Sequence, residues 1–291
     1  MSLKTRHILL LLLTAVIWGF AFTAQSYGGN AMGAYSFNFL RYVIGFLVLQ
    51  PVVLKLTGSL IPDKETVKGG ILCGICLGVA SSLQQSGILL TTPGKAGFLT
   101  AFYMVLVAIA GIFIYRRVSA SVCAAIVMGV TGLWLICIPA GEALSVNRGD
   151  ILCVECAVFF AIQILVIDRF INRVDPVKMS AVQFLTAAAV SAVFWIFSGE
   201  VLTFGMVKEG LLPLLYVGLL STGAAYTLQI IGQRGVDPAI ASLVMSLESV
   251  FSLVGEALIM GLTITGRELL GCAIMFAAVI LSQLPDLLHA L

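Results

Sequence analysis

The 291-residue chain carries very little charge, because only 10% of its residues are Asp, Glu, Lys or Arg while 60% are hydrophobic. A soluble domain carries about 25% charged residues, so a soluble fold of this length would not hide so much apolar surface. The formal net charge is only +2, and no run of basic residues indicates a nucleic-acid partner. The composition therefore predicts an all-α integral membrane protein, with the lipid bilayer as its surroundings.

Motifs for nucleotide binding and hydrolysis are also missing. The sequence has no GxxxxGK[ST] loop, GxSxG or HExxH, and its two histidines lie near the ends of the chain. ATP is therefore not expected to drive the protein directly. The seven cysteines fall in apolar segments, and each CxxC pair, Cys73/Cys76 and Cys153/Cys156, lies at i,i+3 within an expected helix. Apolar packing is the favoured interpretation of these pairs, so we expect no cofactor and no metal.

Long apolar runs are abundant. A transmembrane helix needs about 20 mainly apolar residues, and that window gives ten spans with short connections. The spans cover about 7–27, 34–56, 67–90, 95–115, 120–140, 149–169, 177–198, 207–232, 238–260 and 267–288. With the N-terminus inside, eleven Lys and Arg residues fall on the cytoplasmic side and four on the outer side. This bias predicts a multi-pass protein of a bacterial inner (plasma) membrane, with both termini cytoplasmic.

The two halves of the sequence resemble each other. LQQSGILLTTPGKA from Leu83 aligns with LQIIGQRGVDPAIA from Leu228 at an offset of 145, and the first two spans of each half align at an offset of 142. The chain is thus predicted to contain two five-helix repeats, 1–141 and 142–291, that form one transport unit. Since five is odd, the second repeat enters the membrane from the opposite side. Such inverted repeats are typical of secondary transporters, with the substrate near the midplane between them.

Several short motifs occur in order along this pattern. They are Trp18-Gly19, Leu40-Arg41-Tyr42, Gly94-Lys95-Ala96-Gly97-Phe98-Leu99-Thr100 and Leu247-Glu248-Ser249-Val250. With these motifs the chain resembles the drug/metabolite transporter superfamily, specifically its EamA-type ten-helix members. The resemblance implies movement of small metabolites, amino acids or drugs without ATP, often outward. The chain departs from the family pattern in three places: Ser249 stands where the family often has Pro, Gly261-Leu262 where it often has Gly-Glu, and Glu256 where a small or apolar residue is usual.

Two carboxylates lie in the apolar ninth span, where ionised groups are costly. At about 100° per residue, Glu248 and Glu256 are about 80° apart and share a small, polar arc. The opposite arc is bulky and apolar, which predicts a lipid-facing side; it holds Leu243, Val244, Leu247, Val250, Phe251, Val254 and Leu258. Glu256, Glu155 and Arg41 are expected near the outer face, so Arg41 is predicted to pair with one of these two glutamates. A purely structural tether is the alternative for Arg41.

Glu248 is expected near the midplane, where no basic residue is predicted at its depth. It is interpreted as a hydrogen-bonding group in helix packing, as a contact for a substrate ammonium, or as the carrier of a coupling proton. Tyr103 occupies the repeat position equivalent to Glu248. Other polar and aromatic side chains in the spans complete the candidate substrate-binding set: Glu248, Tyr103, Trp18, Gln84, Gln229, Gln163, Phe102 and Tyr226. Core packing is the alternative for each of the uncharged residues.

The leading hypothesis is a secondary transporter or facilitator that moves a small organic solute by alternating access and exports it. The solute could be an amino acid, a metabolite or a drug-like cation, with protons as a candidate co-substrate. The alternatives are an intramembrane enzyme acting on a lipid or small molecule, and a receptor or scaffold that transports nothing. Ten helices can enclose a complete pathway, so an oligomer is not required.

Overall fold

The computed structural model describes residues 3–91, 93–115, 119–138, 146–261 and 263–289. Every regular element in these ranges is a helix, and nine segments are long and apolar enough to cross a membrane. A further 24-residue helix, α14 (Gly266–His289), stands where the tenth span is predicted. Helices are expected because a lipid-exposed backbone must satisfy its own hydrogen bonds. The predicted all-α membrane fold is confirmed.

In the first half, each predicted span corresponds to a helix or a pair of helices. These are α1 (Leu3–Met32), α2 (Ala34–Thr57), α3 (Lys64–Ile88), α4 (Pro93–Ala101) with α5 (Tyr103–Tyr115), and α6 (Ala120–Cys137). Side-chain caps fix several helix starts. The Asp63 carboxylate, for example, accepts hydrogen bonds from Thr66, which hold the pKa of Asp63 below its usual value.

The second half repeats this order. It begins with α7 (Arg148–Phe170), α8 (Pro176–Ser198) and the short α9 (Phe204–Glu209). After the eighth span come α12 (Pro238–Met245) with α13 (Glu248–Met260), and then α14. The eighth span combines α10 (Leu211–Leu215), the π-helix η1 (Tyr216–Tyr226) and α11 (Thr227–Gly232). The connection between the halves includes 139–145, so the predicted boundary at 141/142 lies outside the described residues.

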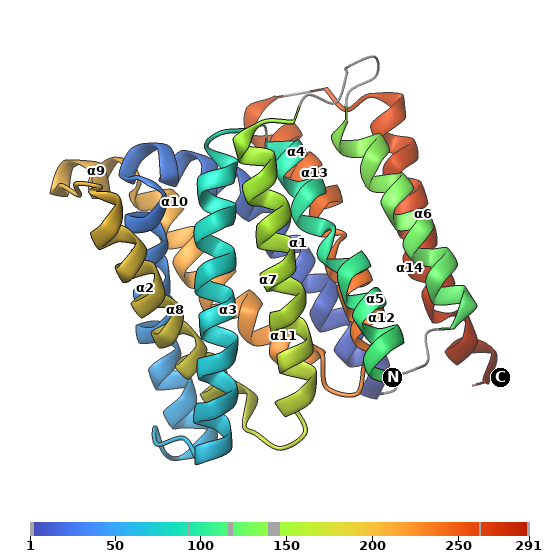
Figure 1. Cartoon of the computed structure of the whole chain (residues 1–291), viewed down its shortest axis with the longest axis horizontal. Coiled ribbons are helices and arrows are strands. Elements are labelled where there is room, and N and C mark those ends of the chain that lie inside the picture. Colours follow the sequence, from blue (N-terminus) through green and yellow to red (C-terminus); the bar gives the residue numbers. More distant parts are fainter. Residues whose placement is uncertain (1–2, 92, 116–118, 139–145, 262, 290–291) are drawn as a thin grey trace.

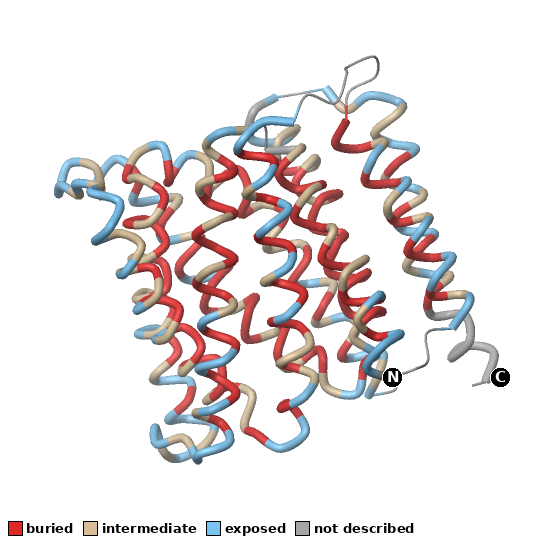
Figure 2. Tube along the Cα trace, viewed as in Figure 1, coloured by how far each residue is buried: buried red, intermediate tan, exposed pale blue. Residues whose placement is uncertain are grey.

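The two repeats interleave into a single bundle. The helix α3 of the first repeat packs along α7 and α8 of the second, and α2 packs along α8. The pair α6 and α14 flanks one side of the bundle, whereas α2, α8 and α9 lie on the other (Figure 1). Buried residues are concentrated on the central helices, and the outer faces are exposed (Figure 2). The interior between the repeats is therefore the place where a protected site can form.

Matching close contacts at opposite ends of the bundle show the inverted repeat. A Cβ built on Gly87 of α3 would lie 2.6 Å from Cys153 Sγ and 2.9 Å from the carbonyl oxygen of Gly149. A Cβ built on its repeat equivalent Gly232 would lie 2.9 Å from Leu11 Cγ and 3.0 Å from the carbonyl oxygen of His7. Leu11 and His7 precede Cys153 and Gly149 by 142 residues, so they are their equivalents in the first repeat. The connection after α3 is at the top of Figure 1, and the equivalent one after α11 is at the bottom.

The fourth and ninth spans are broken at equivalent positions. The breaks fall at Phe102, and at Ser246 and Leu247, where i→i−3 backbone bonds tighten the chain. At the second break, the Ser246 hydroxyl donates to the Leu243 carbonyl oxygen at 2.7 Å, a local bond that competes with regular helix. Tyr103 and Glu248 directly follow the two breaks, so each begins the second half of its span.

The prediction that the bulky arc of the ninth span faces lipid is wrong for the first part of the arc, whereas Leu258 near its end is exposed. Leu243, Val244 and Leu247 are no more than 1% exposed, and Val250 is also buried. They pack into the main apolar core, because α12 lies between α1, α5 and α7 and has neighbours on all sides. Amphipathicity alone does not reveal that a helix is central, since helix interiors and lipid favour the same apolar residues.

Candidate functional site

A small cavity lies between the two repeats. The side chains that line it are Trp18, Phe22, Gln25, Arg41, Gln84, Thr100, Tyr103, Phe160, Gln163, Ile164, Ser221, Tyr226, Gln229, Met245 and Glu248. The space inside for water-sized molecules is about 30 Å³, room for one or two waters. The structure therefore brings seven of the eight predicted substrate-binding residues together, and the exception is Phe102.

The cavity lies on the pseudo-twofold axis of the repeats. Ten of its lining residues form five repeat-related pairs: Trp18/Phe160, Phe22/Ile164, Gln84/Gln229, Thr100/Met245 and Tyr103/Glu248. Equivalent positions of an inverted repeat can surround one space only if that space is on the axis relating them. Its position agrees with the midplane location that inverted-repeat transporters use for substrate.

Glu248 is the carboxylate of this cavity. Its side chain is buried, and its Oε1 accepts a hydrogen bond from the Tyr103 hydroxyl at 3.2 Å. The two helix breaks place these residues at the starts of α13 and α5, so the donor and the acceptor come from equivalent positions of opposite repeats. A buried carboxylate with one neutral donor is incompletely compensated, which makes it a candidate partner for a cationic ligand group.

Arg41 is the cation of the same cavity, and sequence reasoning placed it elsewhere. The residue is 1% exposed, and its guanidinium donates from Nη1 to Gln25 Oε1 at 2.8 Å and from Nη2 to the Tyr42 hydroxyl at 2.9 Å. The Tyr42 hydroxyl in turn bonds the Ser81 hydroxyl. Arg41 Nε has no hydrogen-bond acceptor among the residues that the structure describes. A buried donor without an acceptor costs free energy, so this side chain can accommodate an anionic ligand group.

In the structure Arg41 pairs with neither Glu256 nor Glu155, so the predicted pairing is corrected. Glu155 is exposed on α7, and Glu256 is partly buried on α13 with an Oε1 atom that lacks a hydrogen-bond partner. Arg41 instead bonds uncharged acceptors on α1 and α2 and shares its cavity with Glu248. The position of a residue along its helix predicts how deep its side chain lies in the membrane. It does not predict which neighbouring helix the side chain faces.

Glutamines form one wall of the cavity. Gln163 and Gln229 exchange two hydrogen bonds of 3.1 and 3.3 Å, and Gln163 also donates to Gln183 Oε1 at 3.1 Å. The Gln183 amide nitrogen is buried and finds no acceptor in the described part of the chain. Gln84, the repeat equivalent of Gln229, donates to Thr100 Oγ1 at 3.4 Å. These amides can serve as neutral donors and acceptors for a polar solute.

Aromatic rings form much of the remaining wall. Trp18 packs on Tyr226 with ring centroids 4.6 Å apart, and its indole N–H donates to the Ser221 carbonyl oxygen at 3.3 Å. Ser221 lies in η1, and π-helical segments often occur at functional sites. Phe102 is at the helix break but packs edge-on against Phe98, with centroids 5.4 Å apart. Its ring is therefore a packing element next to the cavity.

Several lining residues were missed by sequence reasoning. Phe160 could have been found by applying the 142-residue offset to Trp18, whereas nothing in the sequence distinguished Phe22 or its repeat equivalent Ile164 from other apolar residues. No sequence signal singled out Gln25, whose role depends on the approach of Arg41. In the described part of the chain, no group of three or more His, Cys, Asp or Glu side chains is arranged to hold a metal ion.

Together, the helical membrane fold, the inverted repeats and an axial cavity lined from both halves define a multi-pass membrane transporter. The EamA-like transporter family model matches residues 5–138 and again 147–284, so the chain belongs to this family. An "Uncharacterized transporter" of Archaeoglobus fulgidus is 26% identical over 275 residues, which span 94% of this chain and 84% of that protein. A solved crystal structure with 21% sequence identity superposes with a TM-score of 0.81, and the alignment covers 96% of this chain and 97% of the other chain. This shows that the two proteins share a fold. The protein is thus a transporter and not an enzyme.

Proposed function

We propose that this transporter carries a small zwitterionic organic solute, such as an amino acid, and that the axial cavity is its binding site. The observation that supports this most directly is the presence of one buried cation, Arg41, and one buried carboxylate, Glu248, in the same cavity. Each is bonded to uncharged groups, Gln25 and Tyr42 for Arg41 and Tyr103 for Glu248. A ligand with both charges would compensate both residues at once.

The different chemistry of the two ends of the cavity favours one orientation of such a solute. Its carboxylate would accept hydrogen bonds from the Arg41 guanidinium, whose Nε lacks an acceptor. Its ammonium group would donate to Glu248, either beside the Tyr103 hydroxyl or in place of it. The rings of Trp18, Phe160 and Tyr226 would then surround the apolar part of the solute. A drug-like cation, the other class considered, would leave Arg41 without compensation.

The small size of the cavity supports alternating access. Space for one or two waters does not hold an organic solute, so loading requires that side chains and helices move apart. The cavity is shared by both repeats, and a relative movement of the repeats would open it toward one side at a time. Export, the direction that the family resemblance implies, is the direction we propose. Glu248 is also the residue that would carry a coupling proton.

Counterflow in proteoliposomes tests this function. The vesicles are loaded with an excess of unlabelled solute, and uptake of the labelled form is followed for matched zwitterionic, cationic and anionic solutes with the same side chain. We expect accumulation of the zwitterion, with little of either singly charged analogue. Equal accumulation of the cationic analogue would overturn the zwitterion assignment. No counterflow across a broad panel of zwitterions would contradict the proposed function as a whole.

A further inference from the structure

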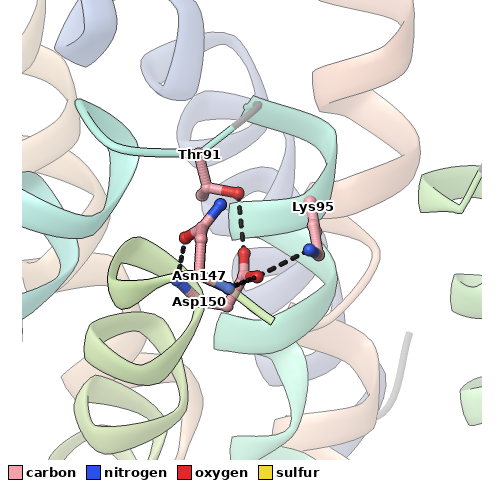
Figure 3. A network of polar contacts seen from close by, with 4 residues as sticks. All are labelled: Thr91, Lys95, Asn147 and Asp150. Carbon is pink, nitrogen blue, oxygen red and sulfur yellow. Dashed lines mark hydrogen bonds and ion pairs between the residues drawn. The ribbon is translucent and has the colours of Figure 1, made fainter. Parts of the chain in front are cut away.

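A second polar network joins the repeats at one end of the bundle, where α3 ends and α7 begins; we name it the α3/α7 end. The carboxylate of Asp150 in α7 accepts from the Thr91 hydroxyl at 2.7 Å, from Lys95 Nζ at 2.6 Å and from the Asn147 backbone N–H at 2.8 Å (Figure 3). The Asn147 side chain caps α7 by accepting from the Asp150 N–H at 2.9 Å. Thr91 and Lys95 belong to the first repeat and Asp150 to the second, so one carboxylate connects the two.

This network lies beside the closest backbone approach of the two repeats. Gly87, four residues before Thr91, meets Gly149 and Cys153 so closely that even a methyl group at Gly87 would not fit. The side chains of Asp150 and Lys95 are only 4% and 18% exposed. The α3/α7 end is therefore sealed by backbone packing and by a largely buried ion pair with two added hydrogen bonds, a strong arrangement for one carboxylate.

The opposite end of the bundle has the same packing without the network. There Gly232 of α11 approaches His7 and Leu11 of α1 in the repeat-equivalent way. The positions equivalent to Thr91, Lys95 and Asp150 are Val236, Ile240 and Ile8. Val236 and Ile240 are buried in the main apolar core, and Ile8 packs against it. One closure is thus polar and charged, and its inverted counterpart is aliphatic.

We propose that Asp150, Thr91 and Lys95 form a latch that holds the α3/α7 end closed, and that opening the cavity toward that end requires this latch to break. The inference rests on the alternating access proposed above. Because the equivalent positions at the opposite end are aliphatic, the latch stabilises closure of the α3/α7 end alone. It therefore shifts the equilibrium between the form open at one end and the form open at the other. Removing it shifts the protein toward the form that is open at the α3/α7 end, and closes the opposite end to the same extent.

Cys153 provides a reporter, because it is buried at this seal beside Gly87. In a background where the other six cysteines are replaced, the rate of labelling of Cys153 by a small hydrophilic maleimide measures opening of the α3/α7 end. We expect Asp150→Asn and Lys95→Met each to raise this rate about tenfold, the scale of losing one charge-assisted hydrogen bond. The double variant should show little further increase, since both changes remove the same ion pair.

The repeat supplies a reporter for the opposite end. Leu11→Cys, in a background free of all seven native cysteines, places a thiol at the position equivalent to Cys153. Its labelling rate should fall in the latch variants, because opening at one end accompanies closure at the other. The control variant is Arg148→Gln, which removes an exposed charge from the same turn of α7 without altering the three residues of the latch. It should leave both rates unchanged.

Two results would overturn the latch. The first is a Cys153 labelling rate that Asp150→Asn and Lys95→Met leave unchanged. The second is a rise of both reporters together, which would mean general loosening of the fold and not a shift between two closures. The measurement needs no substrate. A latch confirmed by labelling would stand even if no zwitterion were transported, and counterflow of a zwitterion would stand even if the latch failed.

Discussion

At the scale of single residues, the site is defined by a basic and an acidic side chain that are not paired with each other. Glu248 bonds Tyr103 and Arg41 bonds Gln25 and Tyr42, all of them uncharged partners. Isolated charges at membrane depth are expensive and mark functional positions. A bound zwitterion would compensate both side chains at once.

The pair leads to a prediction that separates recognition from general damage. Glu248→Gln should weaken binding of the zwitterion about 10- to 100-fold, the scale of one charged hydrogen bond, and should weaken binding of an analogue without the amino group far less. Arg41→Gln should also weaken binding of the zwitterion, and it should weaken binding of an analogue without the carboxylate far less. Ligand-induced thermal stabilisation of the purified protein measures both ratios.

The matched control is Glu155→Gln, which neutralises an exposed glutamate on the same membrane-spanning bundle but outside the cavity. It should leave every ratio unchanged. If Glu248→Gln lowered affinity for both analogues equally, Glu248 would be a packing residue, the alternative that the sequence left open. Full binding and full transport by Glu248→Gln would remove the residue from the mechanism.

At the scale of elements, close helix contacts depend on glycine at repeat-equivalent positions. Gly87→Ala places a methyl group 2.9 Å from the backbone carbonyl oxygen of Gly149, and Gly232→Ala places one 3.0 Å from that of His7. Backbone cannot rotate away as a side chain can, so each change should destabilise the protein by about 1–3 kcal/mol. Thermal unfolding in detergent measures the loss.

Gly97→Ala is the comparison for these two variants. A Cβ at Gly97 meets only Ser249 Oγ, at an ordinary 3.7 Å, so the change should be neutral or slightly stabilising, as Gly to Ala is in a helix with space. Equal destabilisation by all three variants would contradict the argument from close approach. It would indicate instead that any added methyl group in this bundle is harmful.

The elements also show what the sequence could and could not predict. The helices were predictable from the ten apolar runs. The inverted arrangement followed from the odd number of spans per repeat, and the offset of 145 residues equated Tyr103 with Glu248. The breaks at Phe102 and Leu247 were not predicted, because α4 with α5 and α12 with α13 read as continuous apolar segments. The burial of Leu243 and Leu247 was not predicted either, since lipid and protein interior select the same side chains.

At the scale of the whole molecule, orientation in the membrane rests on the charge bias of the connections. In the structure, α1 begins and α14 ends at the same end of the bundle, opposite the α3/α7 end (Figure 1). The bias predicts that the α3/α7 end faces outward. In intact cells, an impermeant thiol reagent should therefore label an Arg148→Cys reporter and spare a Lys64→Cys reporter, both at exposed positions on a cysteine-free background. The opposite labelling pattern would invert the orientation and with it the side on which the latch acts.

The pairing of Tyr103 with Glu248 also bears on how such a chain could have arisen. Two identical five-helix proteins assembled around the same axis would carry the same residue at both positions, either two carboxylates that repel or two phenols without an anion. A phenol that donates to a carboxylate, as here at 3.2 Å, cannot be built from identical copies. With both repeats in one chain that restriction does not apply, because each half can carry its own residue. The proposed recognition of a dipolar solute would therefore depend on having both repeats in one chain, with a different residue at each of the two equivalent positions.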